Sequence, residues 1–68
     1  MPEAFRDRVL AAIDEGFLDQ VKMCVLGIFN RTISGEPMTI SVKKFAVAFN
    51  ELLDAREQAL KEVKKNDG

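Results

Sequence analysis

The chain has 68 residues, of which 47% are hydrophobic and 31% charged, with ten Lys/Arg, eleven Asp/Glu and no His, Trp or Tyr. These fractions are typical of one small globular domain and argue against disorder, collagen-like repeats and a disulfide scaffold. A net charge of −1 argues against a dedicated nucleic-acid or membrane binder. Without His, the commonest general base and metal ligand is missing. We therefore expect a protein that is not an enzyme and that has no cofactor or metal.

The N-terminal residues lack the basic start and continuous apolar segment of a signal peptide. The longest stretch without a charged or strongly polar residue covers residues 23–29. A membrane-spanning helix needs about 20 such residues. The sequence therefore predicts a cytoplasmic protein that does not bind membranes.

A first helical arm is predicted over about residues 3–33. Pro2 and Glu3 suit a helix start, because proline tolerates the first position and a carboxylate there complements the helix dipole. Apolar residues then recur at steps of three and four: Phe5, Val9, Ala12, Ile13 and Phe17. Gly16 is the weak point, since an interior glycine costs about 1 kcal/mol relative to alanine. A break there would give three helices in place of two.

Residues 17–29 are apolar on most sides, with only Asp19, Gln20 and Lys22 clearly polar. Such a helix must be covered on most sides. The alternative is a strand over residues 21–29, which are rich in β-forming residues. A strand would need partners, and the short segments 32–34 and 38–40 offer only a small hairpin, which is marginal in water. We therefore favour a helix.

The strongest helix-breaking signal is Ser34-Gly35-Glu36-Pro37, which places the turn at about residues 34–40. A second arm is predicted over about residues 41–65, with Thr39 or Ser41 as its N-cap. Two overlapping apolar seams fit this arm. One contains residues 42, 46, 49, 53, 56, 60 and 63, and the other residues 45, 49, 52, 56, 59 and 63. The face is therefore wide enough to touch two neighbours.

A helical hairpin is a single layer, and five Phe and three Met in so short a chain exceed what one hairpin can hide. Two hairpins form a four-helix bundle, so we expect an all-α homo-oligomer, with a dimer favoured. A compact three-helix monomer is the alternative. Large residues near the turn are predicted to line a groove for a protein partner: Met23, Phe29, Ile33 and Met38.

Arg56 lies where both seams require an apolar residue. One interpretation is an arginine whose stem packs while its guanidinium reaches solvent. The other is a register-fixing ion pair with a carboxylate of the first arm, in the same chain or across a dimer. The candidate partners are Asp14, Glu15 and Asp19.

Few residues suit other chemistry. Cys24 has apolar neighbours and is expected to be structural. The carboxylates at 14, 15 and 19 are expected to be solvated or to pair with Arg56 and not to bind a metal. Lys43 and Lys44 oppose the helix dipole and are candidate anion contacts. We predict a non-catalytic oligomerising module that binds another protein, as an adaptor, regulator or inhibitor. The alternative is a small nucleic-acid-associated regulator of phage or plasmid type that contacts phosphates through these lysines.

Overall fold

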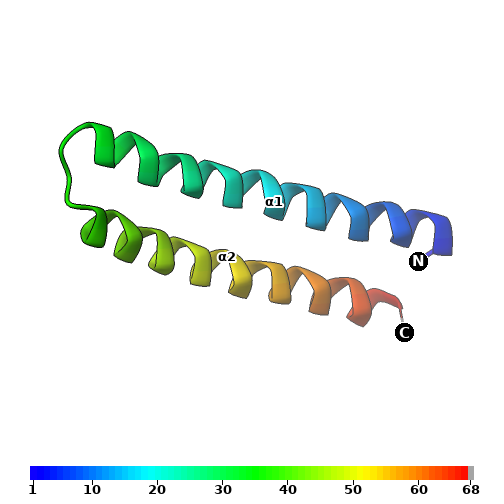
Figure 1. Ribbon diagram of the computed structural model, residues 1–68. Coiled ribbons are helices and arrows are strands. Elements are labelled where there is room, and N and C mark those ends of the chain that lie inside the picture. The colour runs from blue at the N-terminus through cyan, green and yellow to red at the C-terminus, as the bar shows by residue number, and fades with distance from the viewer. Residues whose placement is uncertain (68) are drawn as a thin grey trace.

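The computed structural model describes residues 1–67 and contains two helices, α1 (Glu3–Ile33) and α2 (Met38–Asp67). The helices lie side by side and run in opposite directions, so the N- and C-termini emerge at the same end of the molecule (Figure 1). The predictions of an all-α chain and a helical hairpin are confirmed.

Helix α1 is continuous through Gly16 and through residues 21–29. The break near Gly16 and the strand over residues 21–29, which the sequence left open as alternatives, are both absent from this helix. The cost of one interior glycine is small beside the backbone hydrogen bonds on either side of it. A lone strand would have had no partner, because the rest of the described chain is helix and a short turn.

The C-terminus of α1 is closed by a Schellman motif. The Gly35 N–H donates to the Thr32 carbonyl at 3.1 Å, and the Glu36 N–H donates to the Arg31 carbonyl at 3.0 Å. Gly35 has φ +102°, a left-handed conformation that glycine adopts without steric cost. The glycine therefore ends α1 where the sequence places the turn.

Helix α2 begins at Met38, three residues before the predicted start at 41, and extends beyond the predicted end at 65. The Pro37 carbonyl accepts the first bonds, from the N–H groups of Ile40 and Ser41, at 3.0 and 3.1 Å. Thr39 and Ser41 therefore lie inside the first turn, and their prediction as N-caps is wrong. Proline suits this boundary because it has no N–H to leave unpaired.

The two helices meet along a line that includes residues of both seams predicted for the second arm. The ring of Phe49 lies between two others, with centroids 6.3 Å from Phe17 and 5.6 Å from Phe45. Toward the open end, Leu10 of α1 lies beside Leu60 and Val63 of α2. Among the described residues, this line of side chains is the apolar contact between the helices, and polar contacts join them at Arg31 and Asp14.

The hairpin has almost no interior. In the described part of the chain only Val63, at 8% exposed, and Ser41, at 0%, are buried. The Cα atoms extend over 50 × 16 × 9 Å, with a radius of gyration of 15.7 Å. A compact domain of this length would have a radius of about 11 Å. Neither helix offers an apolar stretch sufficient for crossing a bilayer.

Candidate functional site

The most prominent surface feature is the amount of exposed apolar side chain. Twelve large hydrophobic residues are at least 40% exposed, among them Leu18, Met23 and Phe29 at 62%, 63% and 58%. The accessible surface of the chain is 5265 Å². A compact monomer of 7.6 kDa has about 4300 Å². The hairpin alone therefore leaves roughly 1000 Å² more surface in water than a typical folded chain of this mass.

One face of the hairpin gathers large apolar residues from both helices. Positions three or four apart share a helix face, so the apolar steps 18, 21, 25, 29 and 42, 46, 49, 53 each form one stripe. Asp14 and Arg56 are in contact, so in the antiparallel register of the hairpin the two stripes lie level with each other. We call this surface the large-residue face: Leu18, Val21, Val25 and Phe29 of α1, with Val42, Ala46, Phe49 and Leu53 of α2.

The opposite face carries small residues and shallow hollows. One hollow is bordered by Ala12 and Gly16 of α1 and by Ala55 of α2. A second lies between Met23 and Gly27 of α1 and Lys44 and Ala48 of α2. The other residues that line the hollows include Cys24, Phe45 and Ala59. We call this surface the small-residue face.

The residues predicted to line a partner groove do not all lie on one face. Met23, Phe29, Ile33 and Met38 are all exposed, between 58% and 84%. Met23 borders the small-residue face. Phe29 lies six positions further along, about 240° around the helix, on the large-residue face. The structure therefore distributes these residues over different faces, and binding of a partner through them stays a prediction.

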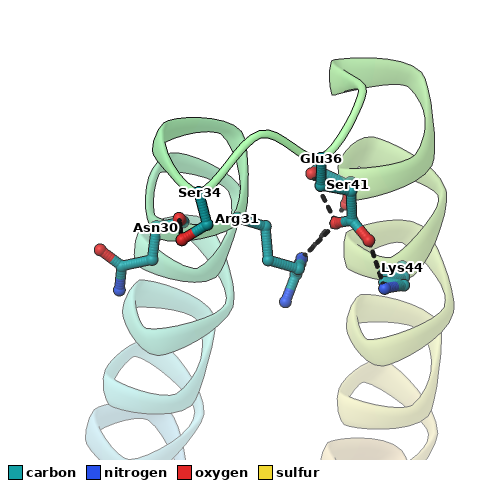
Figure 2. Close-up of polar contacts among 6 residues, drawn as sticks. All are labelled: Asn30, Arg31, Ser34, Glu36, Ser41 and Lys44. Atoms are coloured by element: carbon teal, nitrogen blue, oxygen red, sulfur yellow. Dashed lines mark hydrogen bonds and ion pairs between the residues drawn. The ribbon is translucent and has the colours of Figure 1, made fainter.

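A polar cluster that the sequence analysis missed joins the helices at the turn. The Glu36 carboxylate accepts hydrogen bonds from the Ser41 hydroxyl, at 2.8 Å, and from the Lys44 ammonium. Arg31 lies on its other side, with Nε 3.2 Å from Oε2 (Figure 2). Arg31 also reaches the Ser41 carbonyl across the turn, at 3.4 Å. Glu36 thus links the last turn of α1 to the first turns of α2.

Gly27 leaves space for the arginine of this cluster. A Cβ atom at position 27 would lie 3.0 Å from Nη1 of Arg31. The guanidinium therefore folds back over the glycine while its Nε faces Glu36. The only sequence signal for this arrangement is that opposite charges at 31, 36 and 44 flank a tight turn.

The cluster lowers the pKa of the Glu36 carboxyl below its usual 4.5, mainly through the hydrogen bond from Lys44 and also through that from Ser41. Because the folded pKa is depressed, this stabilisation is present above the unfolded pKa and is lost as the pH falls through the folded value. We expect the Glu36→Gln variant to lose less stability than the wild type between pH 5 and acid conditions, measured by urea unfolding. Parallel pH profiles would contradict the role given to Glu36.

Of the two predicted anion contacts, Lys44 is engaged with Glu36. Lys43 is exposed on the neighbouring position of α2. The two ammonium groups therefore differ in electrostatic setting, because one of them already faces a carboxylate. Phosphate binding through the pair stays a prediction.

Arg56 lies against Asp14 of the same chain. Its Nη2 and Nε are 3.1 and 3.2 Å from one carboxylate oxygen, and its guanidinium carbon is 5.5 Å from the centroid of the Phe17 ring. The arginine therefore packs on an aromatic ring and reaches the surface, where Asp14 is 57% exposed. An exposed ion pair contributes about 0–1 kcal/mol. Glu15 and Asp19, the other predicted partners, are exposed and make no contact with Arg56 in the described structure.

The remaining candidates are dispersed. Cys24 is a free, half-buried thiol next to Met23 and Phe45. Within residues 1–67, no three His, Cys, Asp or Glu side chains are grouped so that they could hold a metal ion. Comparison with known proteins finds no matching family model, no matching curated protein and no matching solved structure.

Proposed function

We propose that the chain is a non-catalytic helical module that acts by protein association, first with a second copy of itself and then, as a dimer, with another protein. The observation that carries this proposal is the missing interior. Only two of the described residues are buried, and the accessible surface exceeds that of a compact chain of the same mass. A chain of this size gains stability most directly by covering that surface with another protein.

The side-chain chemistry supports a binding role. The chain has no His, and its single thiol borders a hollow in which the two charged side chains, Arg31 and Lys44, already face Glu36. The hollow bordered by Ala12, Gly16 and Ala55 contains one charged side chain, Arg56, which already faces Asp14. An adaptor, regulator or inhibitor needs none of these groups as an acid, base or nucleophile.

Apolar residues outside the large-residue face would remain available in a dimer. Leu26 and Val47 are 42% and 62% exposed, and Met23 borders the small-residue face. A further protein partner would bind through such residues, as an adaptor does. This second step depends on the first, so self-association is the property to measure.

We expect sedimentation equilibrium to give a mass near twice 7.6 kDa, with monomer appearing only on dilution. Because folding and association are then linked, the melting temperature should rise with protein concentration. A well-folded single chain at high concentration, with a melting temperature independent of concentration, would refute the proposal.

A further inference from the structure

We propose that a second copy of this chain covers the large-residue face, so that two hairpins form a four-helix bundle with that face at its centre. This inference rests on the proposed function, because it names the surface through which the copies associate. It commits to one of two available faces. The seam pattern, the exposed surface area and the low net charge of the chain favour this face.

The seam pattern favours the large-residue face. Of the two apolar seams on α2, the one containing Phe45, Leu52 and Ala59 lines hollows together with residues of α1. The other seam meets α1 at Phe49, Arg56 and Leu60. Its residues Val42 and Leu53 point away from that contact and are 46% and 40% exposed. Apolar residues in this seam recur at alternating spacings of four and three residues. This spacing is typical of helices that cross at a shallow angle, as in helical bundles.

Helix α1 supplies a matching stripe. Leu18 and Phe29 are 62% and 58% exposed, and the half-buried Val21 and Val25 lie between them. In the antiparallel register Leu18 lies level with Leu53, and Phe29 lies level with Val42. The face therefore extends over both helices without a charged residue among its eight positions. A two-fold axis through it would bring the same apolar surface together from both copies.

The area is sufficient for a stable dimer. Each partner in a standard interface buries about 800 Å². The hairpin exposes roughly 1000 Å² more than a compact chain of its mass, which is of the same order. Two copies with a net charge of −1 each also repel one another only weakly. Covering one face of the hairpin with a second copy would therefore remove an area of the size by which the whole hairpin exceeds a compact chain.

Two substitutions distinguish the faces. Leu18 and Met23 lie on the same helix, are 62% and 63% exposed, and each follows an aspartate by four positions. Leu18→Lys alters the large-residue face, whereas Met23→Lys alters the border of the small-residue face. The two positions are matched in exposure, but Leu18 also borders a hollow with Arg56. The alanine pair described below adds no charge, and it therefore separates an effect on the dimer from repulsion between an added ammonium and Arg56.

We expect Leu18→Lys to raise the dimer dissociation constant about a hundredfold or more, because the change occurs in both copies and replaces buried apolar area with charge. Met23→Lys should change it by less than about threefold. Sedimentation velocity measures both, with far-UV circular dichroism as the check on helix content. The reverse result, with only Met23→Lys dissociating the dimer, would place the interface on the small-residue face and overturn this inference while leaving the proposed function standing.

A folded, monomeric wild type would overturn both the inference and the proposed function. If Leu18→Lys proves too disruptive to fold at any concentration, Leu18→Ala and Met23→Ala provide a milder pair. The alanine at 18 should then weaken association about tenfold more than the alanine at 23. Equal effects of the two alanines would contradict the assignment.

Discussion

Phe49→Ala is expected to destabilise the folded chain by about 2–4 kcal/mol, at the lower end of the range for a buried aromatic because Phe49 is only half-buried. The Phe49 ring contacts the rings of both Phe17 and Phe45, so its removal opens a gap in the middle of the apolar contact between the helices. Urea unfolding followed by helix content, at a fixed protein concentration, measures the effect.

The control for this prediction is Val47→Ala on the same helix. Val47 is 62% exposed, and alanine is the better helix former, so the change should stay within about 0.5 kcal/mol of wild type. If the two variants were equally stable, the aromatic seam would not be what holds the hairpin together.

Gly35→Ala is expected to destabilise the chain by about 1–2 kcal/mol. Gly35 has φ +102°, and an alanine there must adopt a left-handed conformation in which its Cβ crowds the backbone. The strain falls on the residue that lets α1 end and the chain turn toward α2. Thermal or urea unfolding of the variant tests the expectation.

The same substitution at Gly16 should have the opposite sign. Gly16 lies within a regular helix, and an added Cβ meets nothing within 4 Å. Gly16→Ala should therefore stabilise the chain by about 0.5–1 kcal/mol, through helix propensity and a less flexible unfolded state. Two Gly→Ala changes of the same sign would show that the conformation at position 35 is not a constraint.

The sequence was sufficient to predict the hairpin because the deciding signals are local. Apolar spacing of three and four identifies each helix, and Gly35 followed by Pro37 separates them. The preference of helix N-caps for Ser or Thr predicts a start of α2 at about residue 41, after Thr39 or at Ser41, which is later than the observed start at Met38. The chain begins the helix directly after Pro37, and Ser41 donates its hydroxyl to Glu36 from inside the first turn.

The surfaces were harder to predict because they depend on how the helices are rotated about their axes. The seams of the second arm share Phe49, Arg56 and Val63, so the sequence alone does not say which seam meets the first arm. Without knowing how α1 is rotated, the sequence predicts one groove that contains both Met23 and Phe29. The structure places these two residues on different faces. The Glu36 cluster was missed because it needs both helix ends and the turn between them.

The antiparallel register also implies an order of events during folding. The contact between Arg31 and Ser41 spans 10 residues of chain, whereas that between Asp14 and Arg56 spans 42. Closing a short loop costs less conformational entropy than closing a long one, so contacts near the turn can form before those at the open end. We therefore expect the helices to pair first at the turn that holds Glu36. Local unfolding is expected to begin at the opposite end, where the two termini emerge.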